Sequence, residues 1–239
     1  MRIASRIISE KKPPFIIAEI SANHNKSLSR TLKLIEEAKK AGADAVKLQT
    51  YTAETMTLKS NKDDFLIKDK KSLWYNKNLY ELYNQGSLPL EWYKEIFNKA
   101  KKNNILCFSS PFDTSSVDFL QKFKVPAFKI ASFENNHTPL LKKVIKTKKP
   151  VIVSLGLTEL KDVKYLIDLF KKYKYKNFAF LKCTSAYPSK LEESNLKTIL
   201  DLKKRFKIEI GLSDHTPGIG AAIASIAYGA TIIEKHFTD

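Results

Sequence analysis

Short apolar runs that alternate with longer amphipathic stretches are the feature that most constrains the fold of this chain. Each run has four to six residues, the length of a buried strand, and most of the stretches between them have helical periodicity. Strands that alternate with helices along a chain usually form a parallel sheet. The expected strands cover residues 15–20, 45–49, 105–109, 127–131, 151–154, 178–182, 209–212 and 231–234.

The stretches between these runs predict seven helices and one longer excursion. Residues 52–89 exceed what a crossover needs, so we expect a loop excursion there with a short helix of its own. Asp239 follows the eighth strand almost at once, which leaves no room for an eighth helix. We therefore expect residues 1–239 to be one C-terminally truncated domain. The expected helices cover residues 28–41, 90–102, 115–123, 138–147, 160–172, 196–206 and 218–228.

Polar residues at the carboxyl ends of the expected strands distinguish two α/β architectures. In a doubly wound open sheet these ends are spread along one edge, whereas in a barrel all eight converge on one mouth, where active sites form. Nearly every strand in this chain ends in Ser, Lys, Glu or His. A chain of 239 residues also suits a single barrel. The sequence thus predicts a (β/α)8 TIM barrel that lacks its last helix.

Composition excludes several other classes of protein. The net charge is +17, but only four of the 42 basic residues are Arg, whereas nucleic-acid readers favour Arg, so we expect a lysine-rich solvated surface and no nucleic-acid partner. A basic RNA-binding barrel has no support beyond this charge. The most apolar segment, residues 218–233, is too short to span a bilayer, and no signal peptide is evident. Cys107 and Cys183 indicate free thiols in a reducing cytoplasm.

Two histidines at neighbouring strand ends suggest a metal site. Side chains alternate across a strand, so Ser213 shares a face with His215, and Glu234 shares a face with His236. The last two strands of a barrel are neighbours, and His215 and His236 can therefore meet at the mouth. Paired imidazoles suit a divalent transition metal, although a single strand-end histidine is more often structural. His24 also follows a strand, which increases the weight of the pattern.

Lysines and serines at the other strand ends suggest an anion site. A lysine on the inner face of a barrel is costly to bury unless an anion meets it. Lysine supplies charge and serine supplies oriented hydroxyl donors, so the set favours a cradle for phosphate or carboxylate. Glu19, within an apolar strand, can pair with Lys47, act as a general acid or base, or do both. The members of the expected cradle are Lys47, Ser110, Lys129, Ser132, Ser154, Ser185 and Ser213.

Seven strings at these strand ends resemble the sialic acid synthase family, in the same order and over essentially the whole chain. Ser-Ala-Asn-His after the first strand and Cys-Thr-Ser at residues 183–185 make the chain most similar to the pseudaminic acid synthase branch. The strings fit keto-deoxy sugar-acid synthases, another group of phosphoenolpyruvate-dependent barrels, poorly. The matching strings cover residues 17–25, 41–50, 108–112, 128–132, 182–188, 211–216 and 233–238.

The resemblance assigns a role to each of these polar groups. It implies that the lysine and serine cradle binds phosphoenolpyruvate, and that His215 and His236 hold a divalent metal, typically Mn2+, with Mg2+ or Co2+ as alternatives. Gln49, Tyr187 and Glu234 would face the sugar. Glu19 would act on or orient a sugar hydroxyl, so that Glu19, His215 and His236 form the expected catalytic set.

The same resemblance implies the reaction and the partners. A barrel of this kind would condense phosphoenolpyruvate with a 2,4-diacetamido-trideoxyhexose to give pseudaminic acid and phosphate. Alternatives are N-acetylneuraminate or legionaminate synthesis, or an inactive fragment that only binds phosphoenolpyruvate. Family members continue into an antifreeze-like domain, which contributes an Arg to the partner's sugar site in a domain-swapped homodimer, and this chain does not contain that domain.

Overall fold

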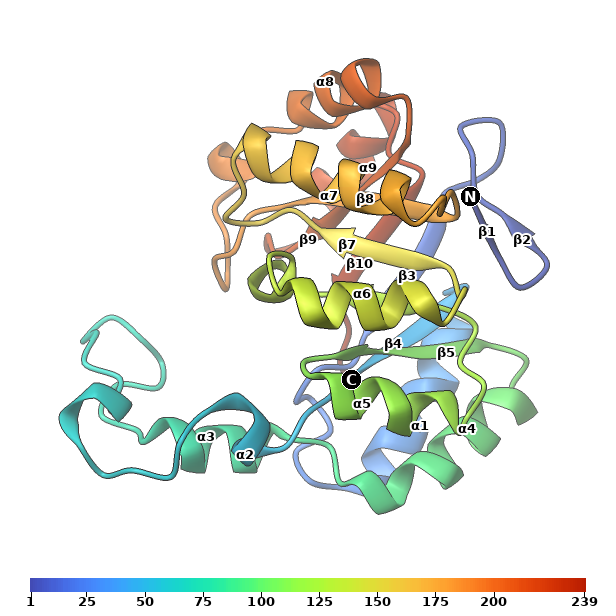
Figure 1. Ribbon diagram of the computed structural model, residues 1–239. Coiled ribbons are helices and arrows are strands. Elements are labelled where there is room, and N and C mark those ends of the chain that lie inside the picture. Colours follow the sequence, from blue (N-terminus) through green and yellow to red (C-terminus); the bar gives the residue numbers. More distant parts are fainter.

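The computed structural model describes residues 1–239 and confirms a closed parallel barrel (Figure 1). Neighbouring strands follow the order β10-β3-β4-β5-β6-β7-β8-β9, so each strand pairs with the next in sequence and the last closes on the first. All eight expected strands are present, with ends that differ by at most two residues. The barrel strands are β3 (Phe15–Glu19), β4 (Ala45–Thr50), β5 (Leu106–Pro111), β6 (Phe128–Ile130), β7 (Val151–Ser154), β8 (Phe178–Cys183), β9 (Glu209–Asp214) and β10 (Ile232–His236).

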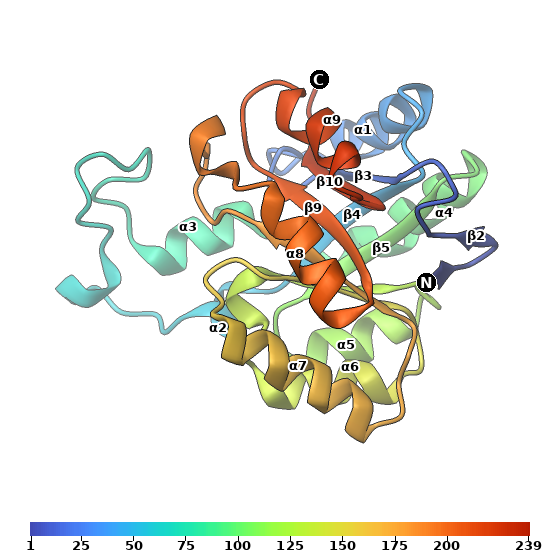
Figure 2. The same cartoon turned by 90° about the horizontal axis from the view of Figure 1, so that it is seen from above.

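Helices surround the barrel on its outer side, as the two ribbon views show (Figures 1 and 2). The seven expected helices are all present, and no helix follows β10 in the chain. The last residue, Asp239, forms ion pairs with Arg30 and Lys33 on the first helix. The outer helices are α1 (Leu28–Lys40), α4 (Tyr93–Lys102), α5 (Thr114–Gln121), α6 (Thr138–Lys146), α7 (Leu160–Lys172), α8 (Lys197–Phe206) and α9 (Gly220–Ala227).

Helix α7 illustrates why these sequences form helices that pack on the barrel. Its buried residues, which include Val163, Ile167 and Phe170, recur at spacings of three and four and form one apolar stripe. Glu159 and Asp162 form a capping box that satisfies backbone donors at its start. The Phe170 ring stacks on that of Phe178 in β8, with centroids 4.1 Å apart. Burial of this stripe fixes the helix against the strand and leaves its lysines in solvent.

A small hairpin closes the amino-terminal end of the barrel, and the sequence did not predict it. Strands β1 (Arg2–Ile3) and β2 (Arg6–Ile7) pair in antiparallel fashion. Ile3 and Ile8 are fully buried in the core, and the side-chain amide of Asn177 both accepts from the backbone N–H of Arg2 and donates to its carbonyl. Two-residue strands lack the alternation that identifies a strand in sequence, which explains the omission.

Residues 52–89 form the expected excursion, which projects from the opposite end of the barrel, on the left of Figures 1 and 2. It contains two helices, α2 (Ala53–Met56) and α3 (Leu79–Gly86), where we expected one. Tyr51 anchors its base through edge-to-face contacts with Tyr83 and Phe112. The excursion thus rises beside the mouth where the strands end.

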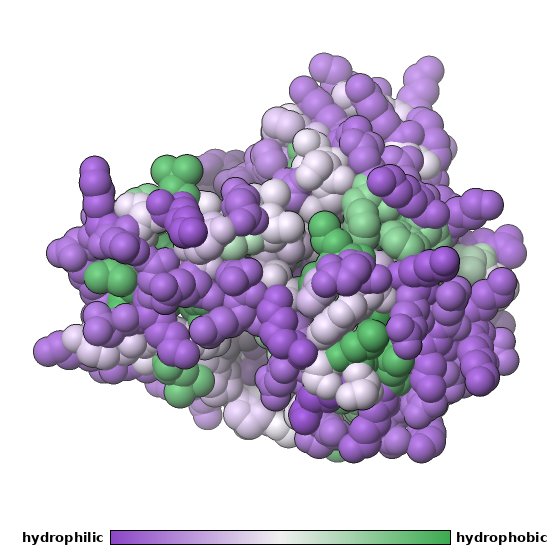
Figure 3. All heavy atoms as spheres, turned by 90° about the horizontal axis from the view of Figure 1, so that it is seen from below, coloured by the Kyte–Doolittle hydropathy of each residue, from purple (hydrophilic) through white to green (hydrophobic).

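Hydrophilic residues cover most of the surface seen from below, with apolar side chains scattered among them (Figure 3). This agrees with the lysine-rich outer faces of the helices. None of the helices combines the length and the apolar character that crossing a lipid bilayer requires.

Candidate active site at the carboxyl ends of the strands

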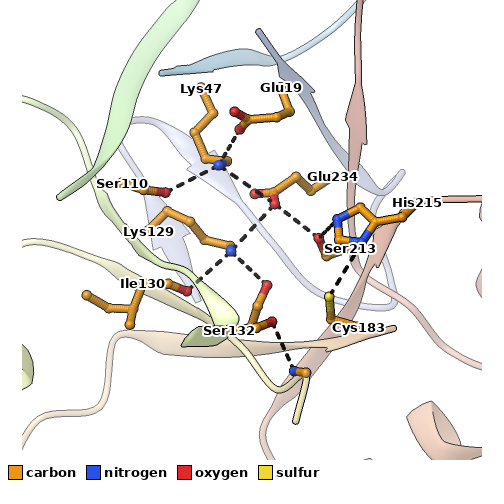
Figure 4. A network of polar contacts seen from close by, with 12 residues as sticks. Glu19, Lys47, Ser110, Lys129, Ile130, Ser132, Cys183, Ser213, His215 and Glu234 are labelled. Atoms are coloured by element: carbon orange, nitrogen blue, oxygen red, sulfur yellow. Dashed lines mark hydrogen bonds and ion pairs between the residues drawn. The ribbon is translucent and has the colours of Figure 1, made fainter. Parts of the chain in front are cut away.

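Four buried charged side chains lie at the centre of the barrel, just below its mouth. Glu19, Lys47, Lys129 and Glu234 come from four different strands, and none is more than 5% exposed. Lys47 forms an ion pair with Glu19, and its Nζ lies 3.9 Å from Glu234 Oε1. Lys129 Nζ lies 3.5 Å from the same oxygen. Figure 4 shows the two lysines converging on Glu234, and we call these four residues the charge cluster.

The charges of this cluster sum to zero, which explains why the barrel tolerates them. Burial raises the pKa of Glu19 although Lys47 opposes the shift, and burial lowers the pKa of Lys129 although Glu234 opposes it. The two lysines outweigh the burial of Glu234 and lower its pKa. Two ammonium groups and two carboxylates therefore offset each other's loss of hydration.

Serine hydroxyls from the predicted cradle lie around the two lysines. Lys47 Nζ donates to Ser110 Oγ at 3.2 Å, and Lys129 Nζ donates to Ser154 Oγ at 2.7 Å. Ser213 Oγ donates to Glu234 Oε1 at 3.1 Å, which ties a third hydroxyl to the charge cluster. Three of the five predicted serines therefore contact the cluster directly.

The other two predicted serines meet at Gly156, two residues after the end of β7. Ser132 Oγ accepts a hydrogen bond from the Gly156 N–H at 3.0 Å, whereas Ser185 Oγ is buried and makes no hydrogen bond within the protein. A Cβ at position 156 would lie 2.1 Å from Ser185 Oγ and 2.6 Å from Ser132 Oγ. Only glycine leaves both hydroxyls accessible here, and the orphaned Ser185 hydroxyl is a donor available to an anion.

His215 and His236 meet at the mouth, as the strand alternation indicated. Their ring centroids are 5.5 Å apart. His215 Nδ1 lies 2.8 Å from the carbonyl of Thr184, which can only accept, so Nδ1 carries a proton; burial opposes the charged ring, but the contacts with Cys183 and Thr184 raise the pKa of His215. Partial burial, together with the positive charges of His215 and Lys47, lowers the pKa of His236 to about 4, so this ring is neutral at pH 7.

This donor pair is compatible with a divalent metal ion, because the His236 ring is neutral at pH 7 and the Thr184 carbonyl engages Nδ1 of His215 but not its Nε2. No group of three His, Cys, Asp or Glu side chains is arranged to hold a metal. Any ion at His215 and His236 would thus take its remaining ligands from water or substrate oxygens. A site with open positions of this kind is typical of catalytic metals.

Two further predicted residues line the mouth. The Tyr187 ring stacks on that of His215 at 4.1 Å between centroids, lies edge-on to His236 at 5.7 Å, and is 51% exposed. Gln49, the last residue but one of β4, lies at the level of Ser110 on the neighbouring strand and is partly exposed. Glu234 differs from both because it is held within the charge cluster. The sugar-facing roles of these residues stay predictions.

The structure adds one candidate and shows the surroundings of His24. His24 is buried, its Nδ1 accepts the Lys26 N–H at 3.1 Å, its ring lies edge-on to Trp92, and its Nε2 has no hydrogen bond within the protein. Glu134, in the 3-10 turn after β6, has a buried Oε2 without a hydrogen bond, and burial raises its pKa to about 7. The sequence analysis missed Glu134 because it follows the strand by four residues, beyond the strand-end pattern.

The chain is thus a parallel (β/α)8 barrel with buried lysines and serines at its centre and two histidines at its mouth, the end where such barrels place their active sites. The family model described as "NeuB family" matches residues 34–239. The chain belongs to this family.

Individual relatives agree with this assignment. The chain is 50% identical over 226 residues to pseudaminic acid synthase of Campylobacter jejuni strain 81-176, an alignment that covers 95% of this chain and 65% of that protein. It is 39% identical over 230 residues to N,N'-diacetyllegionaminic acid synthase of C. jejuni strain NCTC 11168, covering 95% and 68%. The crystal structure of an N-acetylneuraminic acid synthetase from Leptospira borgpetersenii, in complex with citrate, superposes with a TM-score of 0.88 at 32% identity, covering 100% of this chain and 78% of that chain.

Proposed function

We propose that this chain is the catalytic barrel of a nonulosonic acid synthase, which condenses phosphoenolpyruvate with a 2,4-diacetamido-trideoxyhexose to give pseudaminic acid and phosphate. The lysine–serine cradle carries this proposal, because it offers two buried ammonium groups and several hydroxyls at one point. Identity of 50% to a pseudaminic acid synthase, against 39% to a legionaminic acid synthase, supports the choice of sugar. The chain spans 65% of the length of that pseudaminic acid synthase.

In the proposed complex the phosphate and carboxylate of phosphoenolpyruvate lie among Lys47, Lys129 and the free hydroxyl of Ser185. These anionic groups compete with Glu19 and Glu234 for the two ammonium groups, since the charge cluster is already neutral. A released Glu19 carboxylate can accept a proton from a sugar hydroxyl or from water. Burial strengthens each of these contacts because the barrel interior excludes water.

The proposed sugar aldehyde lies at the mouth between Tyr187, Gln49 and the two histidines. A divalent ion held by His215 and His236, such as Mn2+, supplies Lewis acidity to the aldehyde oxygen when it is bound. The methylene carbon of phosphoenolpyruvate attacks the aldehyde carbon, water adds to the enol carbon, and the C–O bond to phosphate breaks. Glu134, with a pKa of about 7, is suited to transfer a proton at neutral pH.

Phosphate release tests this proposal. The purified chain is incubated with phosphoenolpyruvate, Mn2+ and either a 2,4-diacetamido-trideoxyhexose of each stereochemistry or N-acetylmannosamine. We expect phosphate release with the pseudaminic precursor and no release with the His215→Ala variant. Faster release with another sugar would reassign the product. Release from none of the sugars, by a chain that folds and binds phosphoenolpyruvate, would favour the binding-only alternative.

A further inference from the structure

The residues that directly precede the two mouth histidines form an ion pair on the outer face of the barrel wall. Asp214 precedes His215 at the end of β9, and Lys235 precedes His236 in β10. The strand register places Asp214 opposite Lys235. Side chains alternate along a strand, so this pair points outward while the histidines line the mouth.

This ion pair and its hydrogen bonds link the end of β9, which leads into His215, to the end of β10, which carries His236. Lys235 Nζ lies 2.8 Å from Asp214 Oδ2 and donates to the carbonyl of Thr216 at 2.6 Å. Asp214 Oδ1 accepts from both the backbone N–H and the hydroxyl of Thr216, at 3.0 and 2.8 Å. The backbone on either side of His215 is thus held by the same carboxylate and the same ammonium group.

Burial makes this arrangement more rigid than an ordinary surface ion pair. The Asp214 side chain is 1% exposed and that of Lys235 is 27% exposed. Breaking a hydrogen bond to a carboxylate buried to this extent is costly, so the geometry of residues 214–216 is tightly restrained. Asp214, Thr216 and Lys235 also line the small pocket beside Tyr187, His215 and His236.

We propose that Lys235 and Asp214 are positioning residues that set the separation of the two imidazoles and so determine the affinity of the mouth for a divalent metal ion. The proposal rests on the metal role given to His215 and His236 under the proposed function. Residues that orient metal ligands from outside the ligand shell typically change metal affinity about 10- to 100-fold when they are replaced.

The amino-terminal end of the barrel provides a matched control. Lys203 Nζ there lies 2.5 Å from Glu10 Oε1 and donates to the carbonyl of Gly229 at 3.0 Å, and its side chain is 17% exposed. Lys203→Met removes one carboxylate contact and one carbonyl contact, as Lys235→Met does, but far from the histidines. Glu10 is 60% exposed whereas Asp214 is 1% exposed, so Lys203→Met should cost less stability than Lys235→Met, and Mn2+ affinities are compared well below both melting temperatures.

The test measures Mn2+ binding by calorimetry with phosphoenolpyruvate present, and phosphoenolpyruvate binding in EDTA. We expect Lys235→Met to weaken Mn2+ binding at least tenfold and Lys203→Met to leave Mn2+ binding unchanged. Lys235→Arg, which keeps the positive charge, should retain most of the wild-type affinity. Phosphoenolpyruvate binding in EDTA should not change in any variant. If Lys235→Met is unstable, the double variant Lys235→Met/Asp214→Asn removes both charges and should show the same loss of Mn2+ affinity.

A second measurement does not need the metal. Imidazole nitrogen resonances of the metal-free chain should shift for His215 and His236 in Lys235→Met, but not for His24, and Lys203→Met should shift none of them. Unchanged resonances with Mn2+ affinity within twofold of wild type would overturn the positioning role. Absence of Mn2+ binding by the wild-type chain itself would instead remove the metal from the proposed function, and the positioning role would fall with it.

Discussion

The two ends of this barrel bury different kinds of side chain. The amino-terminal end is closed by a hairpin whose Ile3 and Ile8 are fully buried, while the carboxyl end contains the charge cluster and an orphaned hydroxyl at Ser185. Apolar burial stabilises a fold without directional demands, whereas buried charges are stable only with their partners in place. The comparison indicates that the amino-terminal end serves stability and the carboxyl end serves binding.

Loss of one lysine should produce the largest effect and sharpen this comparison. Lys47→Met leaves Glu19 buried without its cation, so we expect a loss of about 3 to 5 kcal/mol in unfolding free energy together with loss of phosphoenolpyruvate binding. Urea denaturation and calorimetry measure the two effects. The double variant Lys47→Met/Glu19→Gln should recover most of the stability and none of the binding. Recovery of binding in that variant would exclude Lys47 from the anion site.

A cavity at the opposite end should uncouple stability from binding. Ile8→Ala removes a core side chain beneath the hairpin, and we expect it to cost about 3 kcal/mol of unfolding free energy. The affinity for phosphoenolpyruvate, measured well below the melting temperature, should match that of the wild type. Weaker binding in proportion to the lost stability would show that the two ends are not independent.

A single methyl group should block the cradle. The Cβ of Gly156→Ala would collide with Ser185 Oγ and Ser132 Oγ, so we expect phosphoenolpyruvate affinity to fall about 100-fold, which is about 2.7 kcal/mol. Gly220→Ala is the control, because a Cβ there meets nothing within 4 Å. Equal affinities in the two variants would place the anion elsewhere.

Glu134 should give the smallest effect, and one that depends on pH. Its folded pKa of about 7 exceeds the usual carboxyl value of 4.5, so the folded chain holds a proton that the unfolded chain releases, and stability falls as pH rises from about 4.5 to about 7. We expect Glu134→Gln to match the wild type near pH 4.5 and to exceed it by about 1 to 2 kcal/mol at pH 8, allowing for partial exposure. Urea unfolding at both pH values measures this, and a constant difference would contradict the raised pKa.

Periodicity and strand-end chemistry predicted most of the barrel but little of its long-range pairing. Alternation and strand order placed His215 near His236, because both follow the ends of neighbouring strands and point to the same side of the sheet. The hairpin was missed because its strands are two residues long. The pairing of Lys235 with Asp214 depends on the register between β9 and β10, which no local pattern reveals. Glu234, assigned to the sugar by resemblance, lies within contact of both lysines, which the sequence did not indicate, and its sugar-facing role stays a prediction.

The most direct test of the division between the two ends is a calorimetric titration of phosphoenolpyruvate in EDTA. It compares the wild type with Lys129→Met/Glu234→Gln, which removes one cation and one anion and so keeps the barrel interior neutral. The expected result is one saturable site per chain, displaced by inorganic phosphate, that the folded double variant lacks. Equal binding by both proteins would show that the charge cluster at the carboxyl end is not the phosphoenolpyruvate site.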